Sequence, residues 1–189
     1  MRTRFFTALI LCVLGESASF AADIPALKEL FAQKYETFYE PRFCGRNTAR
    51  FVSEASRRNI DLSNSYVLKI EGAGFLETSG FYTRAGTNER QMLGYFHVVF
   101  VADDHVFDFD LAEPLVLKLE DYIRLQFTPP YEPFPIFGIA YRAKEQLAHW
   151  TATGFEGSAY IRDEETKAWE MKFPDFVDLD EVMNLERAH

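Results

Sequence analysis

Two apolar runs separated by a short polar turn place the strongest constraint on how this chain can fold. The runs span residues 95–101 and 105–110, and Asp103-Asp104 stands between them. Both runs are rich in Val and Phe, which favour strands that are half or fully buried in a sheet. The sequence therefore predicts a β-hairpin at this point.

Three ionisable side chains lie within the hairpin, and its register decides whether they meet. A two-residue turn pairs Ala102 with His105, and this register continued along the strands places His97 opposite Asp110. Because side chains alternate, His97, Asp108 and Asp110 then project from one face, whereas a one-residue slip would separate them. Burying such groups among Val and Phe is costly unless they are paired. The pattern indicates either catalytic groups or a core histidine beside a buried salt bridge.

The N-terminal residues have the pattern of a secretory signal peptide. A basic start precedes an apolar core at 5–14, and the small residues Ser19 and Ala21 follow. We therefore predict a signal peptide over 1–21, cleaved near Ala21, and a single domain over 22–189. The apolar core is too short for a comfortable transmembrane span. The mature protein is expected to be secreted or periplasmic, without stable membrane insertion.

Loss of the signal peptide changes the charge and the thiol content of the chain. The formal net charge of −9 becomes more negative by one when Arg2, Arg4 and Glu16 are removed. This acidic balance argues against nucleic acid and anionic lipid as partners. Removal also takes Cys12, so Cys44 is the single cysteine of the predicted mature chain and has no internal disulfide partner.

Cys44 stands where a helix is expected to begin. Pro41 ends a helical pattern over 24–39, and apolar residues at helical spacing resume from Thr48. At a helix start, the dipole and the free N–H groups favour a thiolate and can hold an oxyanion. The alternative is an inert small residue that packs at the helix start.

The remaining segments predict a mixed fold. Strands are expected at 65–71 and 136–142, helices at 115–127 and 144–150, a loop-rich segment at 72–88 with a short strand near 81–83, and a proline-rich loop at 128–135. We therefore predict one α+β domain in which the nucleophile helix packs on an antiparallel sheet.

The order of Cys44, then His97, then an acid is typical of papain-like thiol enzymes. There the imidazole takes the thiol proton, and the acid fixes the imidazole tautomer and stabilises imidazolium. Other site classes fit less well. The acids near the turn lack the glycine and distal glutamate of an EF-hand loop, and His105 and His149 have no ligand-spaced partners for zinc. The sequence therefore predicts no metal and no cofactor.

The hairpin reads Gly-Tyr-Phe-His-Val-Val-Phe at 94–100 and Val-Phe-Asp-Phe-Asp at 106–110. These motifs resemble the protein N-terminal glutamine amidohydrolases, in which a Tyr-His-Val-Val strand precedes a Tyr-Asp-Leu-Asp strand and the catalytic cysteine lies upstream at a helix start. Weaker similarity continues at 115–123, 141–143 and 171–180. The resemblance implies a papain- and transglutaminase-like fold and protein-glutamine deamidase activity.

Carried over position by position, the resemblance implies a role for each residue of the triad. Cys44 would be the nucleophile, His97 the general base and Asp108 the orienting acid, with Asp110 as a neighbouring acid. The chain departs from the family at the cysteine, where Cys-Glu-Glu-Asn is replaced by Cys-Gly-Arg-Asn at 44–47.

A second departure concerns the oxyanion donor. Phe38 stands six residues before the cysteine, where papain carries the glutamine that donates to the oxyanion. The expected activity is hydrolysis of a glutamine side-chain amide in a protein or peptide, with release of ammonia. A cysteine protease or transglutaminase with the same triad, and a non-enzymatic exported binding module, remain alternatives.

Overall fold

A computed structural model describes residues 21–41, 43–78, 84, 91–127, 136–153 and 169–172. The elements, in chain order, are α1 (Ile24–Phe38), α2 (Cys44–Arg57), β1 (Ser65–Thr78), β2 (Gln91–Ala102), β3 (His105–Phe107), β4 (Val116–Lys118), α3 (Leu119–Gln126), β5 (Ile136–Arg142), α4 (Ala143–Thr153) and β6 (Trp169–Lys172). The predicted signal peptide up to residue 20, the expected strand near 81–83 and the proline-rich loop lie outside the described residues. Within the described part, no helix has the length and apolar character needed to cross a bilayer.

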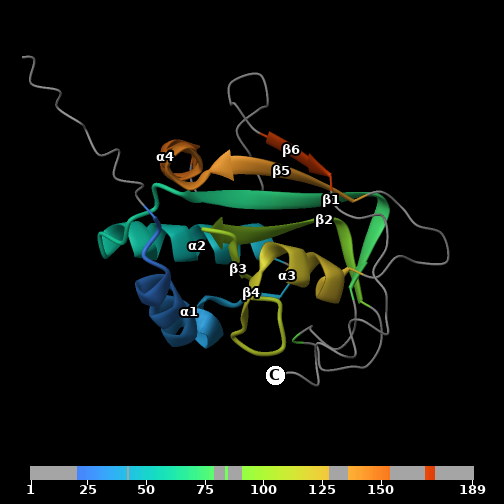
Figure 1. The fold of residues 1–189 in the computed structure, drawn as a ribbon, viewed down its shortest axis with the longest axis horizontal. Helices are drawn as coiled ribbons and strands as arrows, with labels where there is room; N and C mark the ends of the chain where they lie inside the picture. Colours follow the sequence, from blue (N-terminus) through green and yellow to red (C-terminus); the bar gives the residue numbers. More distant parts are fainter. Residues whose placement is uncertain are drawn as a thin grey trace, which may run out of the picture.

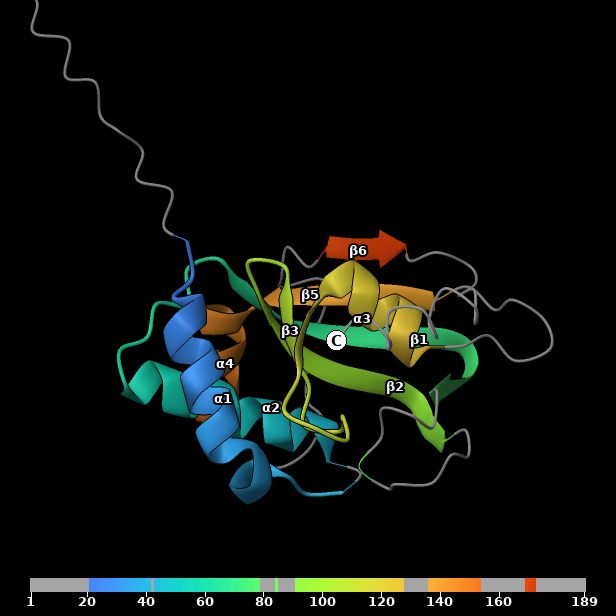
Figure 2. The same cartoon turned by 60° about the horizontal axis from the view of Figure 1, so that its bottom comes forward.

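The strands form one six-stranded sheet in the order β4-β3-β2-β1-β5-β6, and every neighbouring pair is antiparallel (Figure 1). The combination of helices with an antiparallel sheet confirms the α+β class. Figure 2 shows α1, α2 and α4 grouped on one side of the sheet, away from α3. The sheet therefore has a core on each face.

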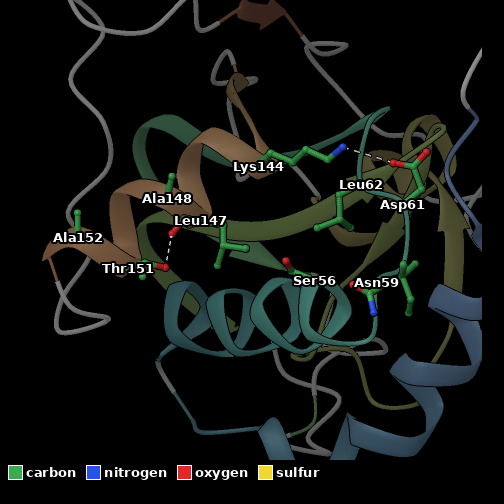
Figure 3. Close-up of a pocket in the computed structure, with 10 residues that line it drawn as sticks. Ser56, Asn59, Asp61, Leu62, Lys144, Leu147, Ala148, Thr151 and Ala152 are labelled. Carbon is green, nitrogen blue, oxygen red and sulfur yellow. Dashed lines mark hydrogen bonds and ion pairs between the residues drawn. The ribbon is translucent and has the colours of Figure 1, made fainter.

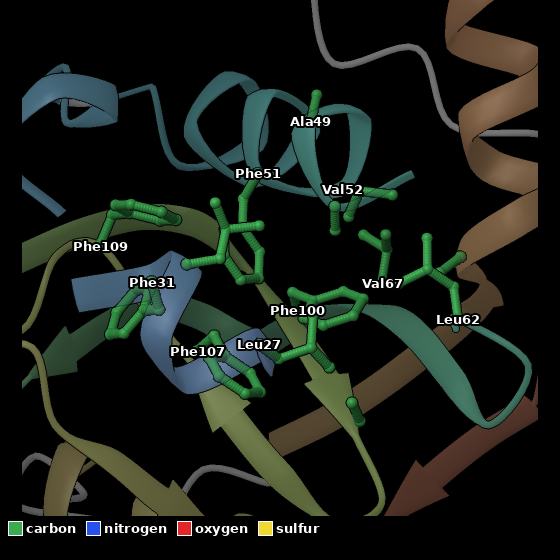
Figure 4. Close-up of a cluster of buried hydrophobic side chains, with 14 of the residues drawn as sticks. Leu27, Phe31, Ala49, Phe51, Val52, Leu62, Val67, Phe100, Phe107 and Phe109 are labelled. Atoms are coloured by element: carbon green, nitrogen blue, oxygen red, sulfur yellow. The ribbon is translucent and has the colours of Figure 1, made fainter. Parts of the chain in front are cut away.

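Alternation along β2 divides its side chains between these two cores. Val98, Phe100 and Ala102 face the core beneath α1, α2 and α4, whereas Val99 and Val101 face the core beneath α3. The first core is aromatic: the ring centroids of Phe31 and Phe51 lie 5.8 Å apart, and those of Phe51 and Phe100 5.4 Å apart (Figure 4). These edge-on contacts hold α1 and α2 against β2.

The turn of the predicted hairpin is confirmed, but its ladder is shorter than expected. Ala102 pairs with His105, and the turn residues have φ values of 42° at Asp103 and 65° at Asp104, as a type I′ turn requires. The ladder ends at the pair Phe100–Phe107, so the expected pairing of His97 with Asp110 does not form. Beyond Phe107, side-chain contacts and not strand hydrogen bonds join the two segments.

Two segments differ from the expected elements. Residues 72–78 belong to β1 and not to a loop, and the register between β1 and β2 shifts between Glu71 and Leu76. Glycine is tolerated at such an irregularity, so a glycine-rich composition does not exclude a strand there. Residues 116–118 form edge strand β4 before α3 begins, because pairing with β3 overrides the local helical pattern.

Candidate active site

Cys44 is the first residue of α2, as the sequence predicts. Its side chain is partly buried and packs against the core beneath α1, α2 and α4. No side chain caps this helix, and its first backbone hydrogen bond runs from Asn47 N to Phe43 O at 2.9 Å. The N–H groups of residues 44–46 therefore have no helical acceptor, and they lie beside the thiol.

The buried amide of Asn47 holds the connection between α1 and α2. Its Oδ1 accepts from the backbone N of Glu40 and its Nδ2 donates to the backbone O of Glu40, both at 3.0 Å. At the next residue of α2, the Thr48 hydroxyl donates to Val98 O at 3.2 Å, which ties the helix to β2. These contacts fix where α2 begins relative to the strand that carries His97.

His97 is 1% exposed and contacts both acids of the hairpin. Its Nε2 lies 3.0 Å from Oδ2 of Asp108, and its Nδ1 lies 3.8 Å from Oδ2 of Asp110. The Cys44 side chain acts on the pKa of this imidazole and therefore lies near it. The three residues predicted from the sequence are thus neighbours in the fold.

The electrostatics of this cluster favour a protonated imidazole. Burial by itself lowers the pKa of His97, but the charge and hydrogen bond of Asp108, together with the nearby Cys44 side chain, raise the pKa well above 6.5. Burial by itself raises the pKa of Asp108, yet the imidazole and two further hydrogen-bond donors bring it below 3.8. At neutral pH the site therefore holds an imidazolium beside a carboxylate.

Both oxygens of Asp108 are engaged. Oδ2 accepts from the Tyr122 hydroxyl at 2.8 Å as well as facing His97, and Oδ1 accepts from the backbone N of Asp110 at 2.9 Å. Phe109, between the two acids, points into the opposite core and contacts the ring of Phe31 at a centroid distance of 4.9 Å. The packing of Phe109 therefore keeps Asp108 and Asp110 on the opposite side of the chain from this core, although the strand ladder has already ended.

Asp110 is in a different electrostatic state from Asp108. Burial and the neighbouring charge of Asp108 raise the pKa of Asp110 to about 6, although His97 and Arg84 act in the opposite direction. Its side chain is 13% exposed. Of the two acids, Asp108 is thus the ionised partner of the imidazole, and Asp110 titrates near neutral pH.

Two residues at this site were not found from the sequence. Tyr122 lies within the helix expected at 115–127, and a buried tyrosine hydroxyl needs a partner, which is the signal that could have revealed it. Arg84 is the second: its guanidinium lies 3.8 Å from the ring centroid of Tyr35 and 4.0 Å from that of Tyr39, and its backbone N donates to Asp110 O at 3.0 Å. No local pattern indicates the position of Arg84.

His97, Asp108 and Asp110 also offer a set of ligand atoms within 4.8 Å of one another. One imidazole and two carboxylates suit several divalent metals. In the structure, both oxygens of Asp108 already accept the hydrogen bonds described above. That the site works without a metal stays a prediction.

A separate hollow of about 830 Å³ lies between the end of α2 and α4 (Figure 3). Its lining includes Ser56, Leu62 and Leu147, and Lys144 Nζ lies 3.5 Å from Asp61 Oδ1 at one side. Ser56 follows Cys44 by twelve residues on α2, a rise of about 18 Å. The hollow is therefore remote from the thiol.

In comparisons with known proteins, no family model and no curated protein matches this chain.

Proposed function

We propose that the chain is a cysteine-dependent amidohydrolase that converts a glutamine side chain in a protein or peptide to glutamate and releases ammonia. The observation that carries the proposal is a set of neighbouring groups: Cys44, at an uncapped helix start, lies near enough to His97 to raise the pKa of its imidazole, and Nε2 of that imidazole lies 3.0 Å from Asp108. A thiol, an imidazole and a carboxylate in this order are the parts of a papain-like nucleophilic site.

Each residue has a defined part in the proposed reaction. With Nε2 engaged by Asp108, Nδ1 of His97 is the nitrogen that holds the proton given up by the Cys44 thiol, so the charged imidazole and the sulfur anion form together. The sulfur then attacks the carboxamide carbon, and the N–H groups of residues 44–46 would stabilise the oxyanion. His97 returns the proton to the departing nitrogen, ammonia leaves, and a thioester remains.

Water completes the proposed cycle. His97 removes a proton from the water, hydroxide attacks the thioester carbon, and the carbon–sulfur bond breaks to give glutamate and the free thiol. Asp108 keeps the imidazole oriented and stabilises its charged form throughout. Asp110 would not touch the reacting atoms directly.

The choice of a glutamine amide as substrate rests on the resemblance of the hairpin motifs to the glutamine amidohydrolases. The sequence Cys-Gly-Arg-Asn at 44–47 lacks the two acids that follow the cysteine in that family. The substrate is therefore proposed as a glutamine within a protein or peptide, and the enzyme as a secreted or periplasmic one. The papain- and transglutaminase-like assignment of the fold belongs to the same proposal.

Ammonia release from a glutamine-containing peptide tests the proposal. Cys44→Ala and Cys44→Ser should both abolish release, with far-UV circular dichroism unchanged. His97→Gln should do the same, whereas His105→Gln, on the same hairpin, should leave release intact because His105 contacts Asp103 and not the triad. Undiminished release by both cysteine variants would end the proposal.

Mass spectrometry of the product separates the alternatives. The small mass gain of amide-to-acid conversion marks deamidation, whereas peptide cleavage marks a cysteine protease and covalent joining to an amine marks a transglutaminase. Activity that survives treatment with a chelator would argue against a metal at His97, Asp108 and Asp110. A protein that modifies none of a panel of glutamine peptides would favour a binding module.

A further inference from the structure

The first described residues of the chain are held by the turn of the hairpin that carries His97. The backbone N of Ala22 donates to Oδ2 of Asp103 at 2.6 Å, across 81 residues of sequence. Ala22 is 7% exposed and belongs to the core beneath α1, α2 and α4, whereas Ala21, one residue earlier, is exposed. Ala22 is thus a buried residue between the exposed residues Ala21 and Asp23.

The carboxylate that receives Ala22 is held in place by its surroundings. The other oxygen of Asp103 accepts from the side-chain amide of Asn64, and the backbone N of Asp103 donates to Asn64 O at 3.2 Å. Lys118, the cation nearest this turn among the ion pairs of the described residues, pairs at 3.9 Å with Asp104 instead. Within that part of the chain, Asp103 is a positioned carboxylate that has a donor but no paired cation.

The chain on the other side of Ala22 is equally fixed. Ile24 N donates to Ala22 O at 2.9 Å, and the Asp23 side chain caps α1 by accepting from Ala26 N at 3.1 Å. A shift of one residue would place a different nitrogen at Asp103 and remove Asp23 from the cap. In the structure, the nitrogen of Ala22 occupies this position.

The sequence pattern points to the same bond. Ser19 and Ala21 are small residues at the third and first positions before it, as a signal-peptide cleavage site requires. Hydrolysis adds water across the amide: the carbonyl carbon of Ala21 becomes a carboxylate, and the nitrogen of Ala22 becomes an amine that is protonated at neutral pH. Cleavage therefore creates a positive charge on the nitrogen that faces Asp103.

We propose that Ala21–Ala22 is the processing bond, and that the ammonium group released on Ala22 forms an ion pair with the Asp103 carboxylate. In the unprocessed chain the same nitrogen is a neutral amide donor, and a charge-assisted hydrogen bond is the stronger of the two. Cleavage thereby strengthens the interaction that holds the new N-terminus at the turn between β2 and β3. The inference does not depend on the proposed enzymatic function.

The first test identifies the N-terminus. The full chain is produced with export, and intact mass and N-terminal peptide mapping are measured on the exported protein. A mature chain that begins at Ala22 is expected. A chain that retains residues before Ala22, or begins after it, overturns the proposal.

The second test measures the ion pair by thermal melting. The chain that begins at Ala22 with a free amine should melt about 2–4 °C higher than the same chain acetylated at that amine. The difference should disappear in Asp103→Asn, which keeps an acceptor oxygen and tolerates the positive φ of 42°. It should persist in Asp104→Asn, which makes the same change at the adjacent turn residue.

Two outcomes of the melting experiment overturn the proposal. One is equal melting of the free and acetylated forms of the unaltered sequence, a comparison that requires no substitution to fold. The other is a difference that survives in Asp103→Asn, since the stabilisation would then come from a group other than the Asp103 carboxylate.

Discussion

The imidazole of His97 is bound more closely by Asp108 than by Asp110: Nε2 lies 3.0 Å from Asp108 Oδ2, whereas Nδ1 lies 3.8 Å from Asp110 Oδ2. The ladder between β2 and β3 ends at Phe100–Phe107, so strand pairing does not set this choice. The Tyr122 hydroxyl and the backbone N of Asp110 both donate to Asp108 and hold its carboxylate toward the ring. The orientation of its carboxylate thus makes Asp108 the closer partner of His97, although Asp108 and Asp110 are chemically identical side chains.

Replacement of the two acids by asparagine should separate their parts in the proposed reaction. Asp108→Asn removes the charge that stabilises the imidazolium, and kcat/KM for ammonia release should fall by about 10³–10⁴. Asp110→Asn should retain most of the activity. Initial rates with one glutamine peptide measure both variants, and equal losses would contradict the distinction.

Asp110→Asn should stabilise the protein at neutral pH. Because the folded-state pKa of Asp110 is about 6, above its usual 3.8, the folded state binds the proton more tightly than the unfolded state does. Ionised Asp110 therefore costs stability, in full above about pH 6 and not at all well below its unfolded pKa. The variant should gain on the order of 2 kcal/mol at neutral pH and nothing near pH 3. Urea unfolding at the two pH values, with Asp104→Asn as a control, measures the effect; a gain that does not depend on pH would contradict it.

The Cys44 thiol should react with iodoacetamide at neutral pH faster than a free cysteine. The pKa of His97 is raised well above 6.5 by Asp108 and Cys44, so its imidazole is charged at neutral pH and attracts the negative charge that develops on the nearby sulfur during alkylation. Stopped-flow alkylation across the neutral range measures the rate. His97→Gln should slow the reaction and His105→Gln should not; equal rates in the two variants would place Cys44 outside the influence of His97.

Tyr122→Phe should destabilise the fold through Asp108. The lost hydroxyl is one of three donors to a buried carboxylate, and a hydrogen bond to a charged group contributes about 1.5–3 kcal/mol. Because the folded-state pKa of Asp108 is depressed, the stabilisation is present at neutral pH and is lost as the pH falls through that pKa. Guanidinium unfolding should show the larger loss at neutral pH. Tyr66→Phe is the control, since the Tyr66 hydroxyl makes no hydrogen bond within the described residues; an equal loss in both variants would mean that the Asp108 contact is not responsible.

Local patterns predicted the elements that carry the site. The helix that starts at Cys44 follows from Pro41 and from apolar spacing, and the turn at Asp103-Asp104 follows from two strand-like runs around a polar pair. The expected start of this helix at 115 was wrong, because residues 116–118 pair with β3 as a strand. The loop expected at 72–78 was wrong because backbone pairing with β2 tolerates glycine at an irregular register.

The sequence alone predicted that His97, Asp108 and Asp110 share one face in the register that a two-residue turn sets, because side chains alternate along an extended backbone. The tertiary structure decided which acid holds the imidazole, that Cys44 reaches it from α2, and that Ala22 meets Asp103. The tertiary structure also brought Tyr122 and Arg84 to the site. Each of these contacts joins separate elements of the chain, and their partners are set by how helices and sheet pack together, which no local spacing of residues encodes.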